Sequence, residues 1–225
     1  MNTYLDGEGG VFMEKSYTKI YTTGATVPLK IRPGHFATNH AHINYYIDVT
    51  TLKARTKEAE EVAQVLVGMY LYDTVIDTIV CMEGTEVIGA FLAEELAKGG
   101  FLSTNAHKSI YVISPEFNNN SQIIFRDNLI PMIRDKHVMI LMASVTTGRT
   151  LNKAVESIQY YGGILQGASA IFSAMDSLDG VPIKSVFGKK DLPDYTYSDY
   201  RDCPLCKAGK KIDALVNTFG YSPMG

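Results

Sequence analysis

Hydroxyl-bearing and cationic side chains surround a glycine in the segment Thr146–Thr150, which reads Thr-Thr-Gly-Arg-Thr. The preceding residues, 138–142, are Val-Met-Ile-Leu-Met and predict a buried strand, and the residues from Arg149 onward have the apolar spacing of a helix. A strand that leads through such a turn into a helix directs free backbone N–H groups and the positive end of the helix dipole at one point. The segment therefore predicts a phosphate site. The alternative is a Thr-rich helix cap without a ligand, because Thr is a competent N-cap residue.

The composition argues against several classes of protein. The 225 residues are 46% hydrophobic and 20% charged, which is typical of one globular domain with a full core. A net charge of −3 argues against nucleic acid or an anionic membrane as the main partner. We expect no membrane span, since no apolar run approaches about 20 residues, and no secretory signal in residues 1–10. With only three cysteines, a reducing cytoplasm is the simplest location.

Apolar strands alternate with amphipathic helices along most of the chain. The spacing predicts strands over 43–49, 75–82, 109–114, 138–142, 165–172 and 183–187. It predicts helices over 56–70, 86–97 and 149–161, two of which are followed by the glycine pairs Gly99-Gly100 and Gly162-Gly163. This alternation predicts an α/β fold with a doubly wound, mostly parallel sheet. Ligands of such sheets lie beyond the carboxyl ends of the strands, where the turns 83–86 and 144–150 both fall.

Other segments are less regular. Val11–Phe12 and Ile20–Tyr21 are candidate short strands or a small helix, and residues 22–24 and 32–34 are turn signals. The Asn-rich segment 116–124 predicts a mobile loop or a hairpin.

The segment from Asp191 is rich in tyrosine and predicts a tail that packs on the domain or on a neighbouring subunit. Residues 212–219 predict a last short helix. We therefore expect a domain over 1–190, with a small N-terminal hood over about 1–45, and a C-terminal tail over 191–225.

Three ordered segments resemble the type I phosphoribosyltransferase family, and its orotate phosphoribosyltransferase branch in particular. Residues 138–151 resemble the PRPP-binding signature, in which four apolar residues, two acidic residues, two small or apolar residues and Thr-Thr-Gly join a strand to a helix. Residues 43–49 are similar to the segment Ser-Pro-Tyr-Tyr-Ile-Asp-Leu of the orotate branch, and residues 82–90 to its pyrophosphate loop and following helix. The resemblance covers roughly residues 20 to 175 and implies the family's α/β fold.

The resemblance also implies an activity: PRPP-dependent transfer of ribose 5-phosphate to a nucleobase in pyrimidine nucleotide metabolism, with Mg²⁺ and in a homodimer. It implies that the 5′-phosphate of PRPP or of a nucleotide is bound by Thr146, Thr147, Gly148, Arg149 and Thr150. The implied pyrophosphate loop comprises Glu83, Gly84, Thr85 and Glu86. Glu83 would contact substrate or metal-bound water, or else it is only a carboxylate at a helix N-terminus.

Three departures from the family pattern fall on the site of one substrate. Met142 and Ala143 stand where the family has an acidic pair, which binds the ribose hydroxyls and stabilises the charge that develops at the anomeric carbon. Loss of two charged hydrogen bonds, worth roughly 1.5–3 kcal/mol each, would slow the reaction by on the order of 10²–10⁴. No Lys or Arg occurs over 115–125, where the family binds diphosphate. Glu86 replaces a glycine of the pyrophosphate loop.

Two hypotheses about the function follow from these observations. In the first, the protein is a phosphoribosyltransferase similar to orotate phosphoribosyltransferase. In the second, it is a non-catalytic homologue that binds a nucleoside monophosphate or a sugar phosphate as a sensor or partner subunit. Within the charged connector 126–136, Arg126 is a further residue that could reach a ligand.

Metal-binding residue types occur in two places. Cys203-Pro-Leu-Cys206 supplies half of the four ligands of a structural zinc ion, which a second copy of the chain or a His could complete. The alternative, a free or oxidisable thiol pair, is the simpler interpretation. His35, His40 and His42 are irregularly spaced without a nearby Asp or Cys and predict a polar loop. We therefore expect Mg²⁺ if the protein is catalytic and otherwise no metal ion, and we expect no zinc at the C-x₂-C.

Overall fold

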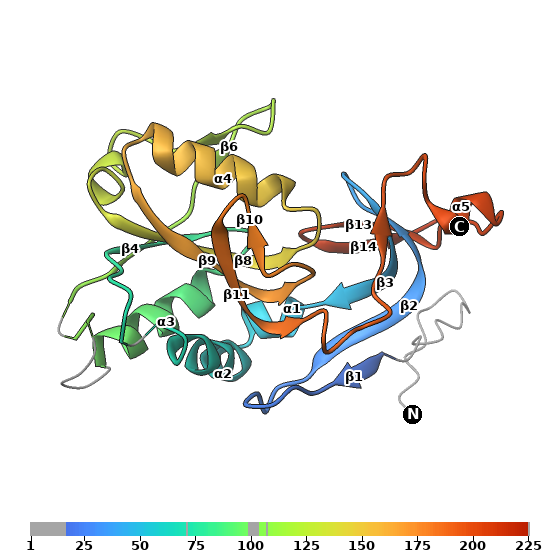
Figure 1. Cartoon of the computed structure of the whole chain (residues 1–225), viewed down its shortest axis with the longest axis horizontal. Helices are drawn as coiled ribbons and strands as arrows, with labels where there is room; N and C mark the ends of the chain where they lie inside the picture. The colour runs from blue at the N-terminus through green and yellow to red at the C-terminus, as the bar shows by residue number, and fades with distance from the viewer. Residues whose placement is uncertain (1–16, 71, 99–103, 107, 225) are drawn as a thin grey trace, which may run out of the picture.

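The computed structural model describes residues 17–70, 72–98, 104–106 and 108–224. The predicted strand at Val11–Phe12 and the predicted helix end at Gly99-Gly100 lie outside these residues, as does the first part of the predicted hood. Within the described ranges, the chain forms a central sheet with helices on both faces and a second sheet at one end (Figure 1). No helix in this part of the chain is long and apolar enough to cross a membrane.

The central sheet is almost entirely parallel. Its strands, in spatial order, are β10 (Ser177–Leu178), β11 (Val181–Gly188), β9 (Ile164–Ser173), β8 (His137–Val145), β4 (Thr78–Cys81) and β5 (Tyr111–Ile113). Only β10 is antiparallel to its neighbour. The five parallel strands, numbered along the chain, follow the order 2-1-3-4-5, which has its ligand crevice between the first and third strands. Those strands are β4 and β8. The predicted doubly wound α/β sheet is confirmed.

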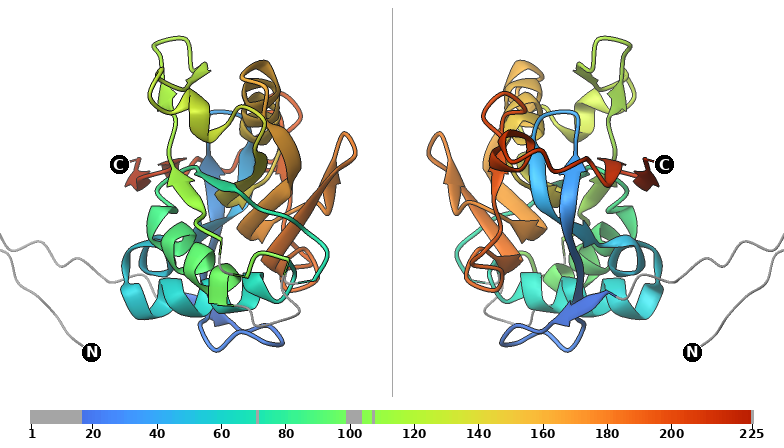
Figure 2. Two further views of the ribbon diagram at one scale, coloured as in Figure 1. Left: turned by 90° about the vertical axis from the view of Figure 1, so that its left-hand side faces the viewer. Right: turned by 90° about the vertical axis from the view of Figure 1, so that its right-hand side faces the viewer.

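Helices cover both faces of this sheet (Figures 1 and 2). Helices α2 (Thr56–Val67) and α3 (Glu86–Lys98) lie on one face and α4 (Arg149–Tyr160) on the other. The remaining helices are α1 (Thr50–Ala54), α5 (Pro204–Lys207), which lies beside the hood, and a 3₁₀ turn, η1, at Ile130–Met132. Along β8, Met139 and Leu141 pack in the core cluster that contains α2 and α3, whereas Ile140 and Met142 pack in the cluster that contains α4. Because alternate side chains enter two different cores, β8 reads as an unbroken apolar run in the sequence.

The hood and the tail form one sheet. Its strands follow the order β12 (Tyr197–Ser198), β3 (His42–Asp48), β2 (Leu29–Ala37), β13 (Ala214–Asn217) and β14 (Gly220–Pro223), and β1 (Thr18–Ile20) also pairs with β2. The tail therefore packs on the hood, as expected, and completes its sheet. The predicted helix over 212–219 is wrong, because pairing of β13 with β2 and β14 overrides the local preference.

Strand β2 passes through the predicted turn 32–34, so that prediction is wrong. The register with β3 shifts between Pro33 and Phe36, which marks a β-bulge that accommodates Pro-Gly inside a strand. Gly34 is required there, since a Cβ at this position would lie 2.6 Å from the ring of Phe36. His35 and His42 consequently lie on strands and not in the expected polar loop.

The predicted hairpin over 116–124 is confirmed as β6 (Glu116–Phe117) and β7 (Ile123–Ile124). It is held against α4: the Ser157 hydroxyl donates to the carbonyl of Ile123 at 3.1 Å, and Lys153 Nζ donates to the carbonyl of Ser121 at 3.3 Å. Figure 2 shows this hairpin beside α4.

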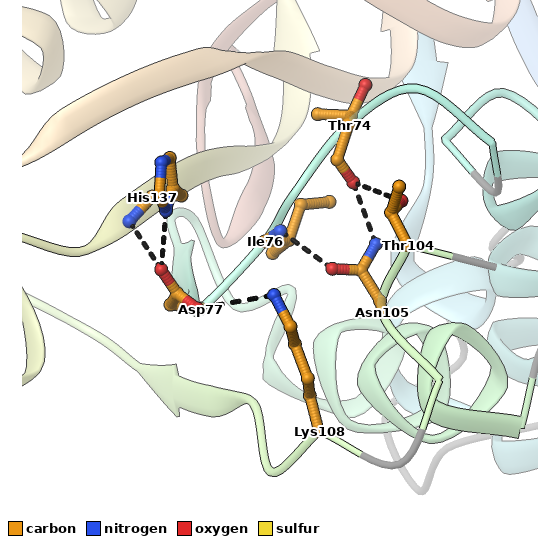
Figure 3. A network of polar contacts seen from close by, with 7 residues as sticks. All are labelled: Thr74, Ile76, Asp77, Thr104, Asn105, Lys108 and His137. Atoms are coloured by element: carbon orange, nitrogen blue, oxygen red, sulfur yellow. Dashed lines mark hydrogen bonds and ion pairs between the residues drawn. The ribbon is translucent and has the colours of Figure 1, made fainter.

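A polar network joins the segments that enter β4 and β8 (Figure 3). Asp77 Oδ2 accepts a hydrogen bond from the backbone N–H of His137 at 2.9 Å and lies 2.7 Å from its Nδ1. Lys108 Nζ lies 3.9 Å from Asp77 Oδ1. The side chain of Asn105 is buried and accepts from the backbone N–H of Ile76 at 2.8 Å. This network fixes the amino end of the central sheet.

Candidate phosphate-binding cleft

A cleft of about 240 Å³ lies between the hood sheet and the carboxyl ends of β4 and β8. One wall is the turn from β8 to α4 together with Glu83, and the opposite wall is formed by the β2–β3 turn, β3, α1 and the β13–β14 hairpin. The predicted ligand crevice of the parallel sheet is thus closed over by the hood and by part of the tail.

The first turn of α4 opens into this cleft. All five predicted phosphate-binding residues, Thr146–Thr150, line it. Gly148 is the N-cap residue and has φ +75°, and the first helical hydrogen bond runs from Asn152 N–H to the Gly148 carbonyl at 2.8 Å. The N–H groups of residues 149–151 therefore have no partner within the helix, and no described side chain caps them.

Gly148 is needed for two reasons. Its left-handed backbone conformation costs an L side chain roughly 1–2 kcal/mol. In addition, a Cβ at this position would lie 2.9 Å from Leu178 Cδ2, on strand β10.

The turn is supported by the tail. The hydroxyl oxygens of Thr146 and Tyr195 lie 3.0 Å apart, and the Tyr195 ring packs edge-on against Phe172 at 5.1 Å between centroids. Burial raises the pKa of Tyr195 to about 12, so this phenol is neutral at physiological pH. The sequence indicated that tail tyrosines pack on the domain but did not indicate that one of them contacts the predicted phosphate site.

Glu83 extends from the end of β4 to the end of β8. Its Oε2 accepts hydrogen bonds from the backbone N–H groups of Ala143 at 3.2 Å and Ser144 at 3.3 Å. Burial raises the pKa of this carboxyl, and the Ser144 amide, the Lys53 charge and the Ala143 amide offset only part of that effect. Glu83 also has φ +60°, which is uncommon for a residue other than glycine. A partly buried carboxylate on a residue with a strained backbone therefore faces the cleft.

The other three residues of the predicted pyrophosphate loop are not among those that line the cleft. Gly84 is exposed, and Thr85 is fully buried, with Oγ1 at 2.9 Å from the Met82 carbonyl and 3.0 Å from the Leu141 carbonyl. The Glu86 carboxylate accepts a hydrogen bond from the Ser114 hydroxyl at 2.7 Å. Thr85 thus ties β4 to β8, and Glu83 alone of the four contacts the cleft.

Lys53 is a cleft residue that the sequence did not reveal. From α1, its ammonium donates to the carbonyls of Glu83 at 2.7 Å and Thr218 at 3.3 Å. Burial lowers its pKa, against the opposite effect of Glu83, Glu86 and Asp48. Nothing in the local sequence distinguishes Lys53 from Lys57, because only the approach of β4 and the β13–β14 hairpin gives it these partners.

Met142 and Ala143, where the family has acidic residues, both line the cleft but face different surroundings. The Met142 side chain is 1% exposed and packs in the apolar cluster that contains Val80 and Leu151. Ala143 follows in the strand and lies on the opposite face, next to the Glu83 carboxylate.

The remaining candidate residues divide between the cleft and other places. His40 lines the cleft, and its pKa is lowered by partial burial and then by the charges of Arg149 and Lys153. Arg126 Nη2 lies 2.6 Å from the Glu116 carboxylate and is not among the lining residues. Cys203 and Cys206 are not lining residues either, and they lie with His35 and His42 on the hood.

Comparison of the sequence with family models and with curated proteins finds no match. Among solved structures, a phosphoribosyltransferase from Corynebacterium diphtheriae is similar, with 14% identity, a TM-score of 0.52, and coverage of 72% of this chain and 90% of the other. UMP synthase from Leishmania donovani is similar at 18% identity and a TM-score of 0.52, over 72% of this chain and 34% of its own. At such identities a likeness shows the fold alone. The chain has the α/β fold of the type I phosphoribosyltransferases.

Proposed function

We propose that the cleft binds the ribose 5-phosphate part of a nucleotide, with the phosphate on Thr146–Thr150 and the sugar between Ala143 and Glu83. The observation that carries this proposal is the N-terminus of α4, which no described side chain caps and which opens into the cleft through a left-handed glycine. Free amides and the helix dipole favour a dianion at this point. Arg149 adds a cation at the same turn.

The ribose position is supported by the single carboxylate among the described lining residues. Glu83 Oε2 lies beside the Ala143 and Ser144 amides, next to the positions from which the family's acidic pair is missing. A carboxylate accepts hydrogen bonds from sugar hydroxyls. Lys53 adjoins it, and two of its three N–H donors are given to backbone carbonyls, which leaves one for a ligand among the contacts of the described residues.

Binding without turnover is the better supported form of this function. Glu86 bonds to Ser114, Arg126 pairs with Glu116, and the 116–124 hairpin is held on α4. None of these groups supplies a cation to a diphosphate in the cleft.

The lining residues also do not fit a protein-held Mg²⁺ ion. Such an ion takes oxygen ligands, usually with one or two carboxylates. Glu83 is the one carboxylate of the described lining, and the positive charge of Lys53 already acts on it. We therefore derive no step through a metal ion.

Titration calorimetry tests the proposal. Uridine 5′-monophosphate, adenosine 5′-monophosphate and ribose 5-phosphate are compared with uridine and adenosine, which lack the phosphate. We expect the phosphate compounds to bind at least about 100-fold more tightly, since several amide donors and the dipole act on a dianion. If no phosphate compound binds, or if the nucleosides bind equally well, the proposal is wrong.

A second candidate is PRPP-dependent transfer, favoured by the position of Glu83. In this reaction a base nitrogen forms a bond to the anomeric carbon and loses its proton to water, while the bond from that carbon to the diphosphate oxygen breaks and the diphosphate leaves with the electron pair. The Glu83 carboxylate would stabilise the positive charge that develops on the sugar. Assays with PRPP and orotate, uracil, adenine or guanine test it: turnover that Glu83→Gln abolishes supports it, and no turnover rejects it.

Restoring the acidic pair must respect the two different environments of its positions. Ala143→Asp adds a carboxylate at the cleft, whereas Met142→Glu would bury one in an apolar cluster. The single variant Ala143→Asp is therefore the informative one. If transfer is latent, we expect it to raise turnover over the wild type.

A further inference from the structure

Four side chains that bind soft metal ions converge on the hood sheet. His35 lies on β2, His42 begins β3, Cys203 is the N-cap residue of α5, and Cys206 lies within α5. One ligand atom from each of the four lies within 4.8 Å of the others. The C-x₂-C motif, which alone supplies half of a site, is therefore joined by two histidines more than 160 residues away in the sequence.

Four of the six separations between these atoms are close to those of a tetrahedral site. His35 Nε2 lies 3.0 Å from His42 Nδ1, 3.5 Å from Cys203 Sγ and 3.6 Å from Cys206 Sγ, and Cys206 Sγ lies 3.3 Å from His42 Nδ1. A zinc ion bound at about 2.0–2.1 Å to nitrogen and 2.3 Å to sulfur holds tetrahedral ligands about 3.3–3.8 Å apart. Small adjustments of the side chains would admit the ion.

Hydrogen bonding alone does not account for this arrangement. His35 Nδ1 lies 2.9 Å from the Lys210 carbonyl, which can only accept, so Nδ1 carries the proton of a neutral ring. The remaining nitrogen, Nε2, then has one lone pair, yet His42, Cys203 and Cys206 all face it. A metal ion that takes a lone pair from each of the four groups satisfies them together. The Lys210 carbonyl supplies the outer contact that usually orients a metal-binding histidine.

The surrounding backbone holds His35 and the two cysteines in place without a metal. The backbone N–H of His35 donates to Asp213 Oδ2 at 2.7 Å, and the N–H of Asp213 donates back to the His35 carbonyl at 2.7 Å. The short helix α5 is closed by hydrogen bonds from Lys207 N–H to the Cys203 carbonyl at 3.0 Å and from Gly209 N–H to the Cys206 carbonyl at 2.9 Å. His35 and Cys203 are buried, whereas Cys206 is exposed and gives an ion access.

We propose that His35, His42, Cys203 and Cys206 form a structural zinc site that fastens the C-terminal segment to the hood sheet. Four protein ligands close the coordination sphere, as in structural rather than catalytic zinc sites. The site is separate from the cleft, because none of the four is among the residues that line it. The zinc proposal can therefore be tested independently of the ligand proposed for the cleft.

Metal analysis of the full-length, reduced wild-type protein is the first test. We expect one zinc ion per chain after exposure to Zn²⁺ and dialysis, and replacement by Co²⁺ should give the visible absorption of a tetrahedral site with thiolate ligands. A chelator should lower the melting temperature, since binding energy at such a site is folding energy. If reduced, folded protein takes up neither ion, the proposal is overturned. A Cys203–Cys206 disulfide that persists under reducing conditions would also overturn it.

Variants assign the ligands. Cys206→Ser and His42→Ala should each weaken Co²⁺ binding at least about 100-fold. Removing a residue that only orients a ligand costs up to about 100-fold in metal affinity, and removing the ligand itself should cost no less. His40→Ala is the matched control, because His40 lies between the two histidine ligands in sequence but is not part of the cluster. Equal loss of the metal in His40→Ala, or full retention in both ligand variants, would show that the ion binds elsewhere.

Discussion

Two carboxylates flank the same strand, β4, and they differ in what they do. Asp77 precedes the strand, within the network of Figure 3, and Glu83 follows it at the cleft. Burial alone would raise the pKa of Asp77, but hydrogen bonds from His137 and the charge of Lys108 outweigh that effect and hold it below 3.8. For Glu83, burial is the stronger influence and the pKa is raised above 4.5.

The difference separates an end of the sheet that stabilises the fold from the end at which we propose that the ligand binds. Asp77 has partners within the chain that favour its charged form, so it stabilises the fold and has little to offer a ligand. At Glu83, which lies beside the cleft, burial disfavours the charged form of the carboxyl, and the backbone has an uncommon conformation. Perturbed carboxylates of this kind are concentrated at functional sites.

Substitution of Gly148 should have the largest effect on ligand affinity. Gly148→Ala should reduce the affinity for uridine 5′-monophosphate by at least about 100-fold, because a side chain strains the left-handed backbone of the turn and its Cβ crowds the end of the Leu178 side chain, which together displace the amides. Gly180→Ala is the matched control, since Gly180 has φ +83° and a Cβ added there would have no atom within 4 Å, so only the strain is shared. Equal affinity losses in the two variants would mean that the turn does not bind the phosphate.

Exchanging the two acids for amides should have opposite consequences. Asp77→Asn should lower the free energy of unfolding by about 1–3 kcal/mol and leave the affinity for uridine 5′-monophosphate unchanged. Glu83→Gln should not lower the free energy of unfolding, and it should lower that affinity by about 10–100-fold, the value of one charged hydrogen bond. Urea denaturation and calorimetry on both variants check this. Reduced affinity in Asp77→Asn with none in Glu83→Gln would reverse the assignment.

The pH dependence of stability should also have opposite signs at the two acids. The folded-state pKa of Asp77 lies below 3.8, so its contribution is present above that value and is lost as the pH falls through the folded pKa. The folded-state pKa of Glu83 lies above 4.5, so the folded state retains a proton that the unfolded state has lost. Stability due to Glu83 therefore falls as the pH rises through that window.

Urea denaturation of the wild type, Asp77→Asn and Glu83→Gln from about pH 3 to about pH 8 measures both slopes. The difference between the wild type and Asp77→Asn should shrink toward low pH, and Glu83→Gln should gain on the wild type as the pH rises above about 4.5. Parallel curves for all three proteins would contradict the contrast between the acids.

The smallest expected effect concerns Arg126. Because it pairs with Glu116 on the exposed hairpin and not with the cleft, Arg126→Ala should change the affinity for uridine 5′-monophosphate by less than about two-fold. Lys53→Met, which removes one of the two cations (Lys53 and Arg149) among the described residues that line the cleft, is the comparison by calorimetry and should weaken binding about 10-fold or more. If Arg126→Ala has the greater effect, the hairpin reaches the ligand in solution.

Features of the site that lie within one contiguous segment could be predicted from the sequence. Features that depend on contacts between segments far apart in the sequence could not. The strand, turn and helix around Gly148 are contiguous, so their pattern identified a candidate cradle. Lys53 and Tyr195 acquire their roles only through contacts with distant segments. The same reason applies to His35, which no spacing rule connects with Cys203.

Two errors have a common physical cause. The Pro33-Gly34 pair indicated a turn, and residues 212–219 indicated a helix, but both segments pair in the hood sheet. Strand pairing overrode local preference in each case, between β2 and β3 in the first segment and between β13 and its neighbours β2 and β14 in the second. The homodimer, which the family resemblance implies, stays a prediction.

Backbone amide NMR spectra of the wild-type protein during titration with uridine 5′-monophosphate test the central claim most directly. The phosphate should shift the amide resonances of residues 147–151, and titration with uridine should not. The amides of Asp77 and His137, at the amino end of the sheet, should not move with either compound. Shifts confined to other parts of the chain, or the same shifts with uridine, would contradict the assignment of the phosphate to the N-terminus of α4.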